Sequence, residues 1–258
     1  TAFEGVPTGL IRSPNGFLAF NKSSGRLAFY DFRTGASRKV LQNQNTGNLS
    51  FGIYLGPATG YVFLDKDGQF LKLDLNTESL TPFPSTASEN PTASDLGRGR
   101  GITILGTDAN ARLYILDPKN QQIWRLPVNE SAIAAPEAWL KTSADFTDSL
   151  GLAVDDSIYV LYPDRVDKYT SGTRQNLSIA AVTPPFQNLA GVFTLSETLS
   201  IYLLDPANER VVVLNKQGQL EKQIISPKFR DLTDIYVDEE SSILYALVGS
   251  ELLQVNLK

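Results

Sequence analysis

Carboxylates and arginines, rather than histidines or cysteines, are the side chains of this sequence that could do chemistry. The chain contains no His and no Cys, so it lacks the usual general base near neutral pH, thiol nucleophiles and zinc–thiolate ligands. Acid–base or metal chemistry would have to come from carboxylate and amide groups. We therefore assign no catalytic residue, no metal ligand and no cofactor.

A binding site is predicted instead, on residues of the longer connections. The predicted binding residues are Arg98, Arg100, Phe186, Phe229, Arg230 and Asp234. Exposed aromatic residues and arginines are favoured at recognition sites, and the arginine fork binds planar carboxylates through two parallel bonds. Such a surface suits a protein or peptide, a sugar or a small anionic ligand.

The lengths of the connections suggest which face is used. The connection Pro82–Arg100 is long, and long loops inside a compact domain are often functional. We expect it to lie on one face with the connections around Phe186 and Phe229–Asp231. The loop Asn129–Pro136 is expected on the opposite face and is nearly free of charge.

An enzymatic alternative stays open. A metal-dependent lactonase or hydrolase could use carboxylates and amides around a divalent cation, without any His. Asp234, Asp148 and Asn188 are expected near the heads of the innermost strands. However, Thr8 and Gly9 stand at the first strand head, where a matching Glu would be needed.

Three aspartates follow equivalent apolar runs, at Asp65, Asp117 and Asp205. In such positions an Asp side chain commonly accepts bonds from backbone N–H groups two residues further on. We expect these residues to cap turns, so that replacing Asp117 or Asp205 by Ala costs on the order of 1 kcal/mol of stability without changing binding.

These residues are carried by a unit that recurs six times. Each copy begins with an aliphatic strand, continues through a short polar turn and reaches an apolar run that ends near Asp. The copies are anchored at Gly9, Gly52, Gly101, Gly151, Gly191 and Asp234, which are 40 to 50 residues apart. That period is typical of a propeller blade of four strands. A Gly at the head of an innermost strand would let neighbouring strands approach closely.

The repeat predicts an all-β fold, a six-bladed β-propeller with four-stranded antiparallel blades. We expect a single domain over residues 1–258, with blades that start near residues 9, 52, 101, 151, 191 and 234. The last copy ends after Leu252–Leu257. Its fourth strand is therefore expected from Thr1–Thr8 or from sequence outside the chain, since an open sheet edge is a liability.

The repeats resemble those of known propeller families. GLAVDDSIYVLY, from Gly151, and IYLLDPANERVVVLNKQGQLEKQI, from Ile201, are similar to repeats of NHL-type and YncE-like propellers. SPNGFLAF, from Ser13, followed by Gly25–Thr34, is closer to TolB-like repeats. The resemblance implies the fold but no single activity, because these families include lactonases, lyases, envelope scaffolds and sensor domains.

The composition of the chain limits the classes of partner that it could bind. The net charge of −5 argues against nucleic acid as a ligand. The chain has no apolar run long enough to insert into a membrane and no visible signal peptide. It begins at Thr1 and has no Met, which leaves room for a membrane anchor or signalling domain outside these residues. We expect a non-catalytic binding, sensing or interaction domain with an extracytoplasmic location.

Overall fold

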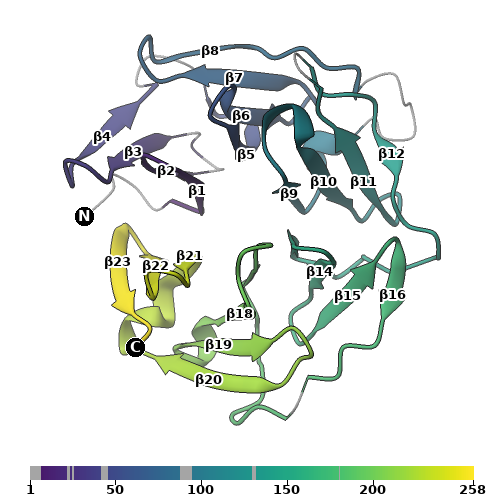
Figure 1. The fold of residues 1–258 in the computed structure, drawn as a ribbon, viewed down its shortest axis with the longest axis vertical. Helices are drawn as coiled ribbons and strands as arrows, with labels where there is room; N and C mark the ends of the chain where they lie inside the picture. Colours follow the sequence, from purple (N-terminus) through teal and green to yellow (C-terminus); the bar gives the residue numbers. More distant parts are fainter. Residues whose placement is uncertain are drawn as a thin grey trace. The chain divides into compact units, whose positions relative to one another are not determined.

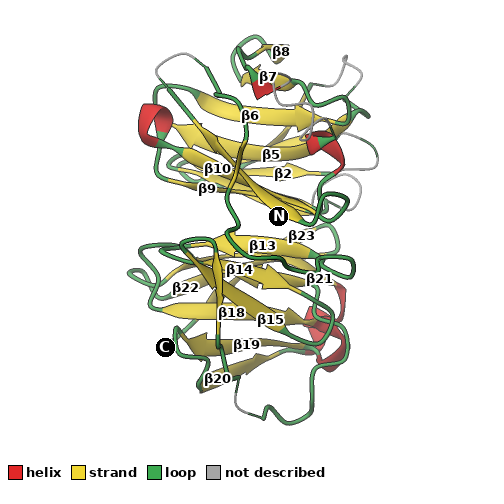
Figure 2. Cartoon of the chain, turned by 90° about the vertical axis from the view of Figure 1, so that its right-hand side faces the viewer, coloured by secondary structure: helices red, strands yellow, loops and turns green. Residues whose placement is uncertain are grey.

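The protein is built almost entirely from strands and loops (Figure 2). The computed structural model describes residues 7–21, 24, 26–41, 46–87, 95–129, 132–179 and 181–258. Its helical segments in these ranges are short 3-10 turns: η3 (Leu96–Arg98), η4 (Asp108–Asn110), η5 (Pro206–Asn208) and η6 (Pro227–Asp231). No helix of the described residues has the length and hydropathy needed to cross a membrane.

The strands fall into six consecutive groups, which we call blades 1 to 6 (Figure 1). Blades 1 to 3 contain β1 (Gly9–Ser13), β2 (Gly16–Phe20), β3 (Leu27–Asp31), β4 (Ser37–Val40); β5 (Leu49–Gly56), β6 (Gly60–Asp65), β7 (Phe70–Asp74), β8 (Ser79–Pro82); β9 (Gly101–Leu105), β10 (Arg112–Asp117), β11 (Gln122–Pro127) and β12 (Glu137–Ala138). Blades 4 to 6 contain β13 (Gly151–Val154), β14 (Ile158–Leu161), β15 (Val166–Thr170), β16 (Thr173–Gln175); β17 (Gly191–Phe193), β18 (Ser200–Asp205), β19 (Arg210–Asn215), β20 (Leu220–Ile225); β21 (Leu232–Asp238), β22 (Ile243–Val248) and β23 (Glu251–Asn256).

Within each blade the strands pair antiparallel in chain order. Five blades have four strands each, and blade 6 has three among the described residues. Six such sheets define an all-β six-bladed propeller, which confirms the predicted fold class. The expected donor of a fourth strand to blade 6, Thr1–Thr8, lies mostly outside the described residues. Thr8 itself extends blade 1, because its N–H donates to the Phe20 carbonyl at 2.7 Å.

Backbone contacts divide the chain into two compact units. The N-terminal unit comprises blades 1 to 3, in residues 7–140 and Ala144–Thr147. The C-terminal unit comprises blades 4 to 6, in Lys141–Ser143 and Asp148–Lys258. Each unit is described by itself below, and a single domain over residues 1–258 stays a prediction.

The cores lie between successive blades of a unit. One apolar cluster joins blades 1 and 2 and a second joins blades 2 and 3. In the C-terminal unit, equivalent clusters join blades 4 and 5 and blades 5 and 6. All residues of the second strands β2, β14 and β18 are buried. That burial explains why these strands read as continuous apolar runs rather than as alternating ones.

The repeated glycine has no single structural cause. At Gly52 an added Cβ would lie 2.4 Å from Ile11 Cδ1 and 2.5 Å from Phe63 Cε1, so the packing of blade 1 against blade 2 excludes a side chain there. At Gly151 an added Cβ would meet nothing within 4 Å. Close approach therefore explains Gly52 but not Gly151.

Candidate functional site

The six predicted binding residues are divided between the two units. Arg98 and Arg100 belong to the N-terminal unit. Phe186, Phe229 and Arg230 belong to the C-terminal unit, as does Asp234. A common face for all six stays a prediction, and each set is described within its own unit.

The segment that carries Arg98 and Arg100 packs tightly against blades 2 and 3. Both are exposed, and they flank the end of η3. An added Cβ on Gly97 would lie 2.0 Å from the Asp65 carbonyl oxygen, so η3 packs tightly on the turn that follows β6. The Arg100 N–H donates to the Leu116 carbonyl at 2.8 Å. The backbone of both arginines is thereby held by blades 2 and 3.

The expected separation of two loops onto opposite faces is wrong. Residues of the connection Pro82–Arg100 are hydrogen-bonded to the loop Asn129–Pro136: Ile133 N–H donates to Pro84 O, and Thr86 N–H donates to Ile133 O, both at 3.0 Å. Ile133 is fully buried in the core between blades 2 and 3. The loop packs inward because it is apolar, and it therefore provides no independent control surface.

Three of the predicted residues in the C-terminal unit are engaged in other interactions. Phe229 was expected to be exposed, but it is 1% exposed and packs in the core between blades 5 and 6, so it cannot contact a ligand. Arg230 is exposed and pairs with Glu209. Asp234 is half-buried in β21, and its Oδ1 accepts the Ile235 N–H at 2.8 Å.

The recurring aspartates do not share one role. Asp65 is confirmed as a turn cap, because its Oδ1 accepts the N–H groups of Asp67 and Gln69 at 3.0 and 2.8 Å. Asp117 accepts the Asn120 N–H at 3.2 Å and also the Trp124 indole N–H at 2.9 Å.

Asp205 is not a backbone cap, contrary to expectation. It is fully buried and forms an ion pair with Arg210, which is 1% exposed, at 2.6 Å. The Nε–H of Arg210 also donates to the same Oδ2 at 2.8 Å. Asp205 Oδ1 is buried without a hydrogen-bond partner among the described residues. Asp205 Oδ2 also accepts from the Asn208 side chain of η5 at 2.9 Å, so the carboxylate bonds to side chains rather than to backbone N–H groups of the described residues.

Arg210 fixes the connection that carries Phe186. Its Nη2 donates to the Pro184 carbonyl at 2.5 Å and its Nη1 to Gln223 Oε1 at 2.7 Å. The Asn208 side chain donates to the Pro185 carbonyl at 3.1 Å. The connection from blade 4 to blade 5 is thus tied down by side chains of blade 5, and the half-buried Phe186 ring lies 5.8 Å from the Arg210 guanidinium.

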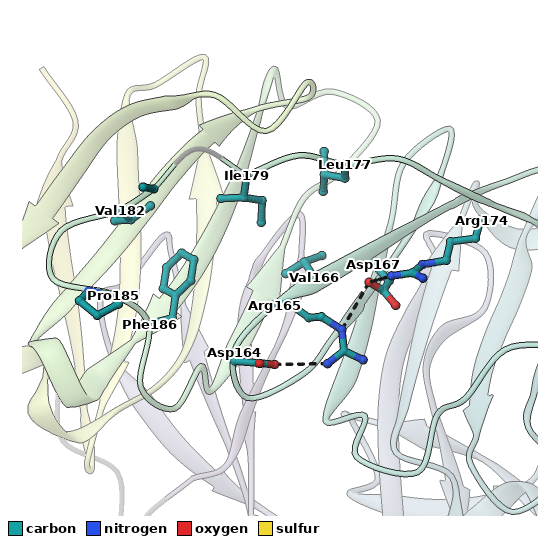
Figure 3. Close-up of a pocket in the computed structure, with 11 residues that line it drawn as sticks. Asp164, Arg165, Val166, Asp167, Arg174, Leu177, Ile179, Val182, Pro185 and Phe186 are labelled. Carbon is teal, nitrogen blue, oxygen red and sulfur yellow. Dashed lines mark hydrogen bonds and ion pairs between the residues drawn. The ribbon is translucent and has the colours of Figure 1, made fainter.

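Phe186 lines a pocket of about 480 Å³ in the C-terminal unit (Figure 3). One wall comes from β15 and β16 of blade 4 and the other from the connection to blade 5. Its lining residues are Asp164, Arg165, Val166, Asp167, Arg174, Leu177, Ile179, Ala181, Val182, Pro185 and Phe186. We call this cavity the blade-4 pocket. Its size is within the range of roughly 300–1,000 Å³ that is usual for small-ligand sites.

Two guanidinium groups share one carboxylate on the charged wall of this pocket. Asp167 Oδ1 accepts from Arg174 Nη2 at 2.7 Å and lies 3.6 Å from Arg165 Nε. The Asp167 side chain is 9% exposed, whereas those of Arg165 and Arg174 are 49% and 61% exposed. Arg165 also reaches Asp164 at 3.3 Å (Figure 3). Asp164 is largely solvent-exposed, so water screens its charge more strongly.

Two buried tyrosines, Tyr162 and Tyr169, interact with the charged residues of this wall. The Arg165 guanidinium lies 3.8 Å from the Tyr162 ring centroid. Burial raises the pKa of Tyr162 and of Tyr169 above the usual 10, with the Asp167 charge adding to both shifts. The hydrogen bond to Asp167 raises the pKa of Arg174. The two phenols therefore stay neutral and Arg174 stays charged at physiological pH.

A lysine–threonine pair elsewhere in the C-terminal unit has the composition of a nucleophile and its base. Lys216 Nζ donates to Thr194 Oγ1 and also to Asp155 Oδ2, the latter at 2.6 Å. The amine is therefore already engaged by a carboxylate and a hydroxyl of the protein. Thr194 is 2% exposed and its hydroxyl donates to the Ser200 carbonyl at 3.0 Å. The cluster joins blades 4 and 5 and is closed to a substrate.

The residues considered for metal-dependent catalysis differ in their surroundings. Asp148 and Asn188 are exposed, whereas Asp234 is half-buried and bonds to backbone. Across the described ranges, no group of three or more carboxylate side chains could hold a metal ion.

Sequence reasoning missed the arginine–carboxylate wall of the blade-4 pocket. The segment from Asp164 to Lys168 carries four charged residues in five positions at the start of a strand. A charge at the inward position of Asp167, next to the apolar Val166 and two residues before Tyr169, is the signal that could have identified it.

Comparison with known proteins shows the fold. No protein-family model and no curated sequence matches the chain. Among solved structures, the chain is similar to PorZ, an essential bacterial surface component of the type-IX secretion system of Porphyromonas gingivalis, with a TM-score of 0.60 and 15% identity. The match covers 100% of this chain and 37% of PorZ.

Two lyase structures are similar as well. Virginiamycin B lyase from Staphylococcus aureus has a TM-score of 0.56 at 9% identity, over 98% of this chain and 85% of the enzyme. A streptogramin B lyase has a TM-score of 0.60 at 12% identity, over 99% and 84% of the two chains. At these identities the similarity shows a shared propeller fold, while chemistry has to be argued from the site.

Proposed function

We propose that this chain is a non-catalytic binding domain that recognises a peptide segment carrying a carboxylate and an apolar side chain. The observation that carries the proposal is the charged wall of the blade-4 pocket. Arg165 and Arg174 share the nearly buried carboxylate of Asp167, and Arg165 also contacts the exposed Asp164, so two accessible guanidinium groups stand beside an apolar wall without a net charge.

The opposite wall favours an apolar group. Leu177, Ile179, Val182 and Phe186 line it (Figure 3). Phe186 is held on a connection that blade 5 ties down, so the wall is preformed and little ordering accompanies binding. An arginine fork offers paired donors to a carboxylate, and the shared Asp167 keeps both guanidinium groups oriented.

The comparisons support a binding role and an extracytoplasmic location without deciding either. PorZ is a surface component of a bacterial secretion system, and the repeats resemble those of NHL-type and YncE-like propellers. The lyases share the fold, but the sequence has no His or Cys and the described residues hold no carboxylate cluster for a metal. A binding domain is therefore the better proposal than a lactonase or hydrolase.

The test is a binding screen with fluorescent hexapeptides that carry either a free or an amidated C-terminus, with and without internal Asp or Glu. We expect peptides with a carboxylate next to Leu, Ile or Phe to bind. Arg174→Ala should weaken that binding about tenfold, because it removes a charge-assisted bond. Phe186→Ala should also weaken it.

The matched control is Arg38→Ala in the N-terminal unit. Arg38 pairs with Glu78 at 2.5 Å, and its side chain is 48% exposed, close to that of Arg165. This variant should bind as the unchanged protein does. Absence of binding by every peptide, or equal affinity of the Arg174 and Arg38 variants, would contradict the proposal.

A further inference from the structure

A second, chemically different groove lies between blades 1 and 2 of the N-terminal unit. Two cavities of about 570 and 550 Å³ adjoin there. They share Asn15, Phe29, Leu75 and Asn76 as lining residues. Together they form one elongated depression, which we call the blade-1/2 groove.

One side of the groove is aromatic and rigid. The half-buried Tyr54 ring contacts Tyr61 edge-to-face, with 5.2 Å between ring centroids. The Tyr61 hydroxyl bonds to Ser13 Oγ at 2.7 Å, and burial raises its pKa to about 12, so this phenol remains neutral. Burial also raises the pKa of Tyr54. The groove therefore presents a fixed, uncharged aromatic ring at Tyr54.

The groove also presents amides and an ionised carboxylate. The side chains of Asn15 and Asn76 are exposed, and neither amide bonds to another described residue. Asp74 Oδ1 accepts the N–H groups of Asn76 and Thr77 at 2.7 and 3.3 Å. These bonds lower the pKa of Asp74 and fix the turn that carries Asn76.

The charges around the groove are mixed in sign. Lys72 and Asp74 line one cavity together, and the pKa of Asp74 is lowered in part by Lys72. Asp31, Arg33 and Arg38 line the other cavity, and Arg38 pairs with Glu78 at 2.5 Å. Counted with Glu78, three basic and three acidic side chains surround the groove, so no excess of one charge draws a charged ligand.

We infer that the blade-1/2 groove binds a neutral oligosaccharide of two or three units. A sugar ring has an apolar C–H face, which matches the aromatic ring of Tyr54, and a rim of hydroxyls, which both donate and accept hydrogen bonds. Asn15 and Asn76 offer amide donors and acceptors, and Asp74 offers an acceptor. Two adjoining cavities suit consecutive sugar units.

The experiment uses the whole chain and a panel of neutral oligosaccharides: chitotriose, cellotriose, maltotriose and mannotriose, each measured by titration calorimetry. We expect at least one to bind. Tyr54→Ala should weaken that affinity about tenfold or more, because the aromatic platform is lost. Tyr54→Phe keeps the ring and should retain most of the affinity, and Asn76→Ala should weaken it.

The control is Tyr236→Ala, since Tyr236 in β21 faces Tyr245 in the same cross-strand arrangement as Tyr54 and Tyr61, and it lines neither cavity of the groove. It should leave sugar affinity unchanged, as should Arg174→Ala. No binding across the panel overturns the inference, and so does equal loss in the Tyr54→Ala and Tyr236→Ala variants or a peptide that competes at Tyr54. Because the groove and the blade-4 pocket lie in separate units, failure of one leaves the other standing.

Discussion

Blades 4 and 5 both place arginine and aspartate where the second strand turns into the third, and the two sites differ in burial. In blade 5, Asp205 and Arg210 are 0% and 1% exposed. In blade 4, Arg165 at this turn and Arg174 in the fourth strand, β16, are about half exposed around Asp167. Similar residues thus form a buried structural contact in blade 5 and an accessible surface in blade 4.

A buried ion pair matters more for the stability of the fold, whereas an exposed ion pair is more accessible to a ligand. Removing one partner of a buried pair leaves an uncompensated charge in a low-dielectric core, whereas an exposed ion pair contributes little because water and salt screen it. The Asp205–Arg210 pair also holds the Pro184 carbonyl, so it positions the connection that forms the apolar wall of the blade-4 pocket. The buried pair thus positions one wall of the blade-4 pocket, and the exposed arginines form the other.

Arg210→Ala should have the largest effect. It leaves the Asp205 carboxylate buried without its partner and releases Pro184 and Gln223. We expect a loss of about 3–5 kcal/mol in the free energy of unfolding, measured by urea denaturation. A loss as small as that of Arg165→Ala would show that the two sites do not differ as described.

Tyr162 and Tyr169, which interact with the charged wall of the blade-4 pocket, should make the free energy of unfolding fall at high pH. Burial raises the folded-state pKa of Tyr162 above 10, its value in the unfolded chain. As pH rises past 10, the unfolded chain loses the phenol proton first, so stability is full below pH 10 and falls above it. The slope contributed is at most about 1.4 kcal/mol per pH unit for each such group.

Tyr162→Phe checks this sign. The variant removes one titrating group, so its free energy of unfolding should fall less steeply above pH 10 than that of the unchanged protein. An identical slope would mean that Tyr162 does not retain its proton in the folded state.

Asp167→Asn should cost less than Arg210→Ala. The change removes a carboxylate shared by two arginines, but both guanidinium groups are half exposed and regain water. We expect a loss of about 1 kcal/mol or less in stability, together with altered peptide affinity. Thermal unfolding and the peptide screen measure the two effects on the same sample, and a loss equal to that of Arg210→Ala would remove the distinction between the sites.

Arg165→Ala should have the smallest effect on folding. Its contacts to Asp164 and Asp167 are 3.3 and 3.6 Å long and half exposed. We expect a change within about 0.5 kcal/mol, reduced further by added salt. Melting curves at low and high salt test this, and a large, salt-independent loss would place Arg165 among the structural residues.

The blades were predictable from sequence because their signals are local. A second strand with neighbours on both faces must be apolar throughout, as Ile201–Leu204 is, and the next turn must be polar. The cap at Asp65 was predictable for the same reason, since its bonds reach only to Asp67 and Gln69. Six copies of one local pattern were enough to indicate six blades.

The candidate site was predictable only in part. Phe186 was identified from its connection, and the structure places it in the blade-4 pocket. Phe229 occurs in a similar connection but is buried, because its ring fills the space between blades 5 and 6. Sequence shows that an aromatic residue lies in a loop, but not whether the loop turns it toward solvent or toward the neighbouring blade.

By itself, the sequence determined that the chain is an all-β repeat protein and that its strands pair within successive repeats. It also excluded catalysis through His or Cys. Tertiary structure alone decided which charges are buried. Asp205 meets Arg210 while Asp65 meets backbone, although both follow the same apolar run. The reason is physical: the desolvation of a charge depends on what a neighbouring blade and its connection cover, and those atoms come from positions far away in the chain.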